Sequence, residues 1–323
     1  MHRLLITLAL AAGLLAASES ASAQTYPTKP LRLICGFPPG AAADAVSRIL
    51  ANALSSALGQ PVIVENKPGA ESMIAAEYVT RSAPDGYTIL FASSSNMVAA
   101  PALRREPPYD PTSDFTPLSL IGHGTFLLFS HPSVPASNLH ELIEYLRANP
   151  DKVNYATGNP IAIIATAQFM RATGTRMVQV PYKGEAPAIP DLVAGRVQLE
   201  FIATVAVALP HVNTGRLRVL AAMTDRRSPL APDVPTLAEL GVPEVTMRLW
   251  AGLYGPAKLP AAVTQRLSGE INAALRRPEV REQLLRQGYD PQGSSSEELA
   301  AYVKSQYALW KQAVKEAGVA LLD

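Results

Sequence analysis

Leu31 to Asp44 is the segment whose residue types are best suited to binding an anion. Its mostly apolar first part, Leu31 to Cys35, predicts a strand, and Gly36-Phe37-Pro38-Pro39-Gly40 ends it because prolines lack an N–H donor. A helix is expected from about Ala41 to Leu58, where apolar residues recur at helical spacing. The first N–H groups of such a helix have no internal partner and carry the positive end of its dipole. The small residues beside them admit a carboxylate or phosphate, and an ordinary turn without a ligand is the alternative.

Two further turns could line the same site. Ser93 to Asn96 follows the predicted strand Tyr87–Ala92 with a run of small polar residues. Open α/β sheets bind ligands at the carboxyl ends of their strands, whereas the alternative for this run is a serine-rich helix cap. Thr157 to Pro160 joins the predicted strand Val153–Ala156 to a helix from about Ile161 to Thr173. Two strand–turn–helix units that face each other across a cleft would form a small-molecule site.

Catalysis is the competing use of these residue types. The sequence contains no Gly-x-Ser-x-Gly elbow, phosphate-binding loop, Gly-x-Gly-x-x-Gly or His-Glu-x-x-His. A serine among Ser93, Ser94 and Ser95 paired with a histidine would make a hydrolase, but no motif fixes that geometry. The histidines beyond the N-terminal segment do not lie at metal-ligand spacing; they are His123, His131, His140 and His211. We therefore expect no catalysis, no metal and no cofactor.

Asp44 and Cys35 each have two possible roles. Asp44 could bind a ligand amine, but we expect it to accept hydrogen bonds from its own loop, since it would repel a carboxylate at close range. Cys35 is the only cysteine and ends a strand that reads as buried. We interpret it as a small apolar filler rather than a nucleophile.

The N-terminus and the overall charge predict an exported protein that does not bind nucleic acid. Met1-His2-Arg3, the apolar run Leu4–Ala17 and Ala21-Ser22-Ala23 form a signal-peptide pattern, so the mature chain is expected to start at Gln24 and to reside in the periplasm. No later stretch is long and apolar enough to span a membrane. The 28 basic and 27 acidic residues give a net charge of +1, which argues against a nucleic-acid surface.

The order of the expected elements predicts two α/β domains. Strands and helices alternate along the chain, which favours mostly parallel sheets with helices on their faces. The last helices have no neighbouring strands of their own, so we expect them to pack against the first sheet. This gives a signal peptide at 1–23, a discontinuous first domain at 24–124 plus 246–323, and an inserted second domain at 125–245.

Short blocks along almost the whole mature chain resemble the Bug family, the TctC-like periplasmic solute-binding proteins of tripartite tricarboxylate transporters. The blocks include Tyr26–Ile34, Phe37–Gly40 with Asp44, Gly59–Ala70, Ala83–Thr88, Pro108–Pro111, Asp114–Pro117, Val180–Gly184, Leu209–His211, Gly215–Arg218 and Pro232–Thr236. The resemblance implies a type II, Venus flytrap fold with a central sheet and flanking helices in each domain. It also implies a small carboxylate ligand and no catalysis. The partner would be a membrane permease of the tripartite type or, alternatively, a sensor protein that reads the closed form of a monomer.

The resemblance also implies which residues bind the ligand. The loop matching Phe37 to Asp44 would hold one carboxylate through backbone N–H groups and ordered waters, and other turns would line the cleft. The implied set is Phe37, Pro38, Pro39, Gly40, Ala41, Ala42 and Asp44; Ala70, Glu71 and Ser72; Ser93, Ser94 and Ser95; Gly158, Asn159, Ile161 and Ala162; and Ile202, Ala203 and Thr204.

Three departures from the family pattern change the expected ligand. The first loop has Ala41-Ala42-Ala43 where relatives carry glycines and a hydroxyl residue. Pro160 and Ile161 follow Asn159, and Ile202-Ala203 stands where many relatives place Asp or Asn after Phe. The far side of the cleft is therefore expected to be more apolar than is usual in the family, which favours a monocarboxylate or an aromatic or aliphatic acid over a tricarboxylate.

Overall fold

The computed structural model describes residues 26–185, 187–203, 205–224, 226–245 and 248–322. The predicted signal peptide and Gln24 lie outside the described residues. One group of strands comprises β1 (Leu31–Cys35), β2 (Val62–Asn66), β3 (Thr88–Ser93), β4 (Phe115–Gly124), β10 (Trp250–Pro256) and β11 (Tyr289–Pro291). A second group comprises β5 (Leu127–Ser130), β6 (Asn154–Thr157), β7 (Val178–Pro181), β8 (Leu199–Ile202) and β9 (Arg218–Ala222).

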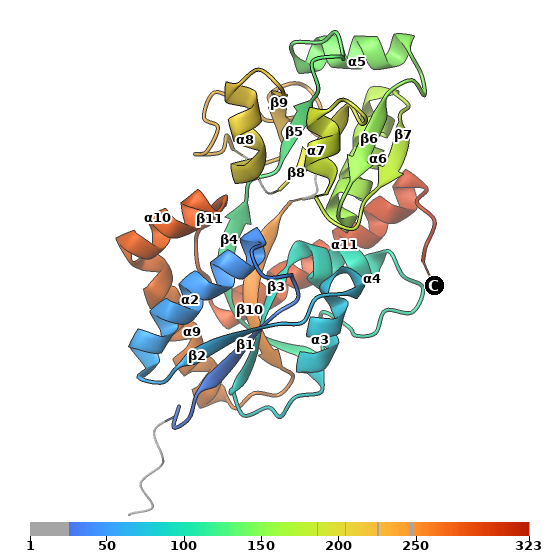
Figure 1. Cartoon of the computed structure of the whole chain (residues 1–323). Coiled ribbons are helices and arrows are strands. Elements are labelled where there is room, and N and C mark those ends of the chain that lie inside the picture. Colours follow the sequence, from blue (N-terminus) through green and yellow to red (C-terminus); the bar gives the residue numbers. More distant parts are fainter. Residues whose placement is uncertain (1–25, 186, 204, 225, 246–247, 323) are drawn as a thin grey trace, which may run out of the picture.

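These groups form two separate sheets, of order β11-β4-β10-β3-β1-β2 and β7-β6-β8-β5-β9 (Figure 1). We call the first sheet and its helices the first lobe, and the second sheet and its helices the second lobe. Helices and turns of the first lobe are α2 (Ala42–Leu58), the 3-10 turn η2 (Ala70–Ser72), α3 (Met73–Thr80), the π turn η3 (Ser95–Ala99), α4 (Ala100–Ala102), α9 (Ala261–Arg276), α10 (Pro278–Arg286) and α11 (Ser296–Ala317). Those of the second lobe are α5 (Leu139–Ala148), α6 (Pro160–Thr173), α7 (Ala188–Val193) and α8 (Val205–Asn213). The α/β fold class predicted from the sequence is confirmed.

The first lobe has helices on both faces of its sheet because its strands are apolar on both faces. Successive side chains of a strand point to opposite faces. Leu31, Leu33 and Cys35 of β1 pack in one core cluster with residues of α2, α9 and α10. Ile34 packs on the other face, in a second cluster with residues of α3, η3 and α11. Cys35 is fully buried, as its interpretation as an apolar filler requires, and burial raises the pKa of its thiol.

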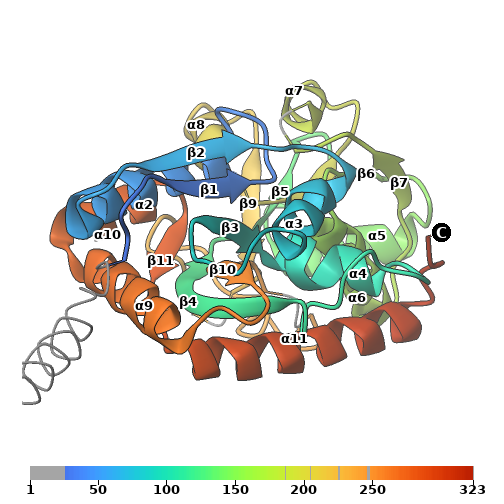
Figure 2. The ribbon, with the colours of Figure 1, turned by 90° about the horizontal axis from the view of Figure 1, so that it is seen from below.

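The second lobe repeats this layering and is joined to the first by α11. Its sheet packs against α7 and α8 on one face and against α5 and α6 on the other. The core cluster on the α6 side continues into α11, so buried residues of both lobes belong to one cluster. Figure 2 shows α11 running along one side of the molecule from below β4 toward α6. The predicted domain boundaries remain a prediction.

Strand pairing in the first sheet fixes where its parallel strands end. β1, β2 and β3 are mutually parallel, and β10 runs antiparallel to β3. Ser93, the last residue of β3, pairs with Ala251 near the start of β10. Ala251 also pairs with Gly122 near the end of β4. The carboxyl ends of β1 and β3 therefore lie at the edge where β4 leaves the first lobe.

The second sheet presents the matching edge. β5 follows β4 after a short connection and begins at Leu127, which pairs with Ile202, the last residue of β8. β6 and β7 run parallel to β8, so their carboxyl ends lie at this same edge. The carboxyl ends of the parallel strands in both sheets are thus directed toward the connection between the lobes (Figure 1).

Candidate functional site

Asp44 holds the first predicted ligand loop in place. Its carboxylate accepts hydrogen bonds from the Gly40 N–H at 3.0 Å, from Asn66 Nδ2 at 2.8 Å and from Arg48 Nε at 3.0 Å. Burial opposes ionisation of Asp44, but these hydrogen bonds outweigh it and hold the pKa of the carboxyl below its usual range. Asp44 thus accepts hydrogen bonds from its own loop, as expected.

The amino end of α2 lies open beside that loop. Ala41 precedes the helix, and no side chain caps it. Pro38, Pro39 and Gly40 are exposed, and Ala42 is partly exposed. The unpaired N–H groups of a helix start attract an anion, and the small side chains here allow it to approach.

The second predicted segment, Ala70 to Ser72, packs directly against the first loop. A Cβ added at Gly36 would lie 2.5 Å from Ser72 Cβ, so this close approach requires glycine. Ala70, Glu71 and Ser72 all adopt left-handed backbone angles, with φ of 44°, 57° and 69°. Such angles cost about 1–3 kcal/mol for each non-glycine residue and occur often at ligand-binding segments. The Glu71 carboxylate accepts a hydrogen bond from Arg104 at 2.9 Å.

The predicted serines are buried where β3 ends. The Ser93 N–H donates to Asn96 Oδ1 at 2.8 Å, and Ser94 Oγ accepts from the Trp250 N–H at 3.3 Å. Ser95 begins the π turn η3 and is also buried. The Asn96 amide nitrogen is buried without a hydrogen-bond partner among the described residues, which leaves a donor at this end of the strand.

In the second lobe, the predicted residues are connected through Glu185. Asn159 caps α6 by accepting from the Ala162 N–H at 2.8 Å, and its Nδ2 donates to Glu185 Oε1 at 2.6 Å. The Ala203 N–H donates to both Glu185 oxygens at 3.1 Å. A Cβ on Gly158 would lie 2.5 Å from the Glu185 backbone nitrogen, so these two turns touch.

The other predicted ligand residues of the second lobe lie in its core or outside the described residues. Ile161 and Ala162 belong to the core cluster shared with α11. Ile202 packs in a separate cluster with α7 and α8. Thr204 lies outside the described residues.

Sequence reasoning missed three polar residues of this region. Asn66 ties the end of β2 to the first loop, since its Nδ2 also donates to the Phe37 carbonyl at 2.9 Å. Glu185 and Glu200 are acids buried in the second lobe. The far side, which we expect to be more apolar than in relatives, thus also contains a carboxylate, because Glu185 accepts hydrogen bonds from the Asn159 amide and the Ala203 N–H. Its overall polarity stays a prediction. A glutamate between apolar strand residues, as at Glu200, was the available signal.

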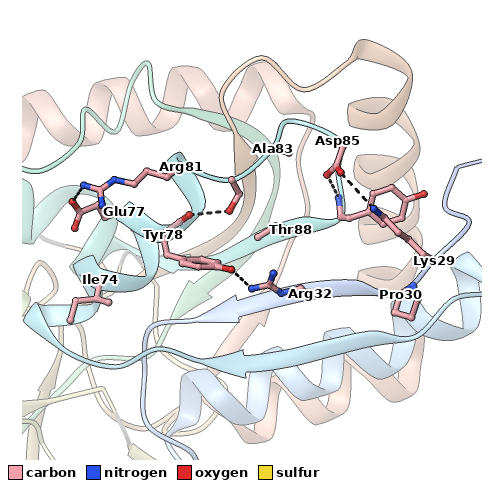
Figure 3. Close-up of a pocket in the computed structure, with 12 residues that line it drawn as sticks. Lys29, Pro30, Arg32, Ile74, Glu77, Tyr78, Arg81, Ala83, Asp85 and Thr88 are labelled. Carbon is pink, nitrogen blue, oxygen red and sulfur yellow. Dashed lines mark hydrogen bonds and ion pairs between the residues drawn. The ribbon is translucent and has the colours of Figure 1, made fainter.

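A cavity of about 810 Å³ lies elsewhere, at the amino ends of β1 and β3 beside α3 (Figure 3). It is lined by Lys29, Pro30, Arg32, Ile74, Glu77, Tyr78, Arg81, Ser82, Ala83, Asp85, Tyr87 and Thr88. None of the predicted ligand residues belongs to this set. The cavity therefore lies at the opposite end of the parallel strands from the candidate site.

Three basic side chains that line this cavity are each paired with an acid. Lys29 Nζ lies 3.9 Å from Asp85 Oδ2, and Arg32 Nε lies 2.7 Å from Glu65 Oε1. Arg81 forms an ion pair with an acid on the preceding turn of α3. Acids therefore neutralise the basic groups of this cavity.

The described ranges contain neither a candidate metal site nor a membrane-spanning helix. No group of three His, Cys, Asp or Glu side chains is arranged there to hold a metal ion. No helix in those ranges combines the length and apolarity that a membrane span needs.

Known proteins resemble this chain in sequence and in overall fold. Residues 46–319 match the TctC family, described as the tripartite tricarboxylate transporter family receptor. Protein BugT of Bordetella pertussis is 34% identical over 99% of both chains. R. palustris Rpa4515, solved with adipate, is 31% identical with a TM-score of 0.84, covering 92% of this chain and 100% of that one. MatC (Rpa3494) from Rhodopseudomonas palustris, solved with bound malate, is 28% identical with a TM-score of 0.79, covering 90% of this chain and 100% of that one. The resemblance inferred from the sequence is confirmed, and the chain belongs to the TctC family of tripartite tricarboxylate transporter receptors.

Proposed function

We propose that this chain is a periplasmic solute-binding protein that captures a small carboxylate between its lobes and delivers it to a permease of the tripartite tricarboxylate type. We propose further that the ligand is a monocarboxylate or an aromatic or aliphatic acid, and that the protein performs no catalysis.

The uncapped amino end of α2 is the observation that carries the proposal. It lies at the carboxyl edge of the first sheet, and the Asp44 network orders the loop around it. Backbone N–H groups at a helix start recognise a carboxylate without a charged side chain. The solved relatives with adipate and malate support a carboxylate as the ligand class.

A binding panel on the mature protein tests the ligand class. The protein, produced from Gln24, is unfolded and refolded to remove any retained ligand, and its melting temperature is then measured with mono-, di- and tricarboxylates, amino acids and sugars. Ligand at about 100 times Kd stabilises a protein by about 2.7 kcal/mol, which is a readable shift. We expect shifts with monocarboxylates. The absence of a shift with every acid after refolding would reject the function.

Ala42→Asp tests the position of the site. A carboxylate at the start of α2 interacts favourably with the helix dipole, so the fold should keep its stability. It should also repel the ligand carboxylate and lower its affinity at least about tenfold. Ala261→Asp makes the same change at the exposed start of α9 and serves as the control. Equal ligand affinity in the two variants would rule out the α2 end as the site.

A further inference from the structure

We propose that the Glu185 carboxylate acts as an internal anion that occupies the donor groups of the second lobe and makes the site discriminate against ligands with a second carboxylate. This inference rests on the proposed function. It assigns the discrimination to one buried carboxylate rather than to apolar side chains.

Glu185 is held as a bound carboxylate would be. Its side chain is buried, and the residue is only 9% exposed. Its oxygens accept from Asn159 Nδ2 at 2.6 Å and from the Ala203 N–H at 3.1 Å. Both donors belong to residues predicted to line the ligand site. An amide nitrogen and a backbone N–H are the groups that would otherwise donate hydrogen bonds to a ligand oxygen.

The helix starts of the two lobes differ in how their donors are used. In the first lobe, no side chain caps α2, whose amino end remains open to a ligand. In the second lobe, Asn159 caps α6, and the Ala203 N–H just before α8 is bound to Glu185. One anion position is therefore open and the other is already filled by the chain itself.

Glu185 also lies on the side of the second lobe that faces the first. Tyr289 belongs to β11 of the first lobe. Burial, and then the charge of Glu185, raises the pKa of the Tyr289 phenol, with a smaller effect from Cys35 at the end of β1. The packing agrees: a Cβ added at Gly288, the residue before β11, would lie 3.9 Å from the Ala203 carbonyl oxygen, and the Ala203 N–H donates to Glu185. This part of the second lobe therefore lies against the residue that leads into β11.

Glu200, a second buried acid, adds no negative charge beside Glu185 at physiological pH. Glu200 on β8 is 1% exposed, and neither of its carboxylate oxygens has a hydrogen-bond partner among the described residues. Burial, and then the charge of Glu185, raises the pKa of Glu200 to about 9, so Glu200 is neutral at physiological pH. A ligand with a second carboxylate would meet the Glu185 charge in surroundings that screen it poorly.

The test compares acids that differ only in their second charge. Isothermal titration of refolded wild-type protein uses a monocarboxylate of the chain length that gives the largest thermal shift, the matching dicarboxylate, and the monomethyl ester of that dicarboxylate. We expect the monoacid and the monoester to bind at least about tenfold more tightly than the diacid. Equal affinities for the diacid and its monoester would overturn the inference without using any variant.

Glu185→Gln and Glu185→Ala then identify the residue responsible. We expect the ratio of diacid to monoacid affinity to rise at least about tenfold in both variants, because the charge is removed. Glu282→Gln removes an exposed acid of α10 and controls for net charge. An unchanged ratio in folded Glu185 variants would reject the assignment while leaving the proposed function intact. Failure of wild-type protein to bind any acid would instead reject the proposed function.

Discussion

Asn66 Nδ2 donates a hydrogen bond to Asp44 Oδ1 at 2.8 Å and thereby joins the end of β2 to the first turn of α2. The same nitrogen donates to the Phe37 carbonyl at 2.9 Å, so one amide fixes both ends of the candidate ligand loop. The loop is held by hydrogen bonds within the chain itself, which lowers the entropy that ligand binding must overcome.

Asp44→Asn should loosen this loop. The substitution weakens charge-assisted hydrogen bonds to a buried carboxylate, and we expect a loss of about 1–3 kcal/mol in unfolding free energy near neutral pH. The folded pKa of Asp44 lies below its ordinary value of 3.8, so its contribution is present above that value and is lost as pH falls through the folded pKa. Denaturant unfolding at several pH values should therefore show that the difference in unfolding free energy between wild type and Asp44→Asn becomes smaller in acid.

Asp85→Asn is the matched control for that substitution. Asp85 is exposed and lies 3.9 Å from Lys29, a pair that contributes at most about 1 kcal/mol. A variant at Asp44 that behaves like this control at every pH would contradict the role given to the loop network.

Gly158→Ala should separate the two turns that meet in the second lobe. The added Cβ would lie 2.4 Å from the Gly184 carbonyl carbon, and backbone cannot yield as a side chain can. We expect a loss of about 1–3 kcal/mol in stability and weaker ligand binding, because the Asn159–Glu185 contact depends on this approach. Gly269→Ala is the control, since a Cβ there meets nothing within 4 Å and alanine favours the α9 helix by up to about 1 kcal/mol. Equal stability and equal ligand affinity of both variants would contradict the close packing.

Glu200→Gln should change how stability depends on pH. The carboxyl has an ordinary pKa of 4.5 when unfolded and a folded pKa of about 9, so between these values the folded state holds a proton that the unfolded chain has released. The contribution of the Glu200 carboxyl to the free energy of unfolding is fully present below about pH 4.5. It falls as the pH rises toward about 9, by up to about 1.4 kcal/mol per pH unit. Because a glutamine side chain stays neutral, the unfolding free energy of Glu200→Gln should not show this decline.

Denaturant unfolding of wild type and Glu200→Gln across this pH range measures the difference directly. The variant should gain stability relative to wild type as the solution becomes more alkaline. Glu279→Gln, at an exposed position of α10, should follow the wild-type curve. Parallel curves for all three proteins would show that Glu200 is ionised when folded.

The sequence predicted elements well where a local pattern determines them. The strand Leu31–Cys35 has the predicted bounds, and α2 begins at Ala42, within a residue of its expected start. Apolar spacing and the Pro-Pro-Gly turn are local signals, so no distant contact was needed to find this unit.

Features that depend on distant contacts were not predicted. The helix α3 begins at Met73, directly after three residues with left-handed backbone angles, which alanine, glutamate and serine do not favour locally. The short strand β11 exists through pairing with β4, far away in the sequence. Glu185 is buried only because a turn more than twenty residues away supplies Asn159 Nδ2, whereas an isolated glutamate in a sequence reads as exposed.

The contact between α6 and α11 contains a buried part and an exposed part, and we expect the two to differ in energy. Trp310 of α11 is fully buried in the core cluster that includes Ile161 and Phe169 of α6. Its replacement by alanine should lower the unfolding free energy, measured with denaturant, by about 3–5 kcal/mol, because neighbouring side chains cannot fill the cavity that the indole leaves. Arg171 of α6 donates to the Glu316 carbonyl at 3.1 Å and forms an ion pair with the Glu316 carboxylate at 3.2 Å. Both side chains are about half exposed, so Arg171→Ala should cost less than about 1 kcal/mol in unfolding free energy. Comparable losses in the two variants would mean that the exposed ion pair, and not the shared core, holds the second lobe against α11.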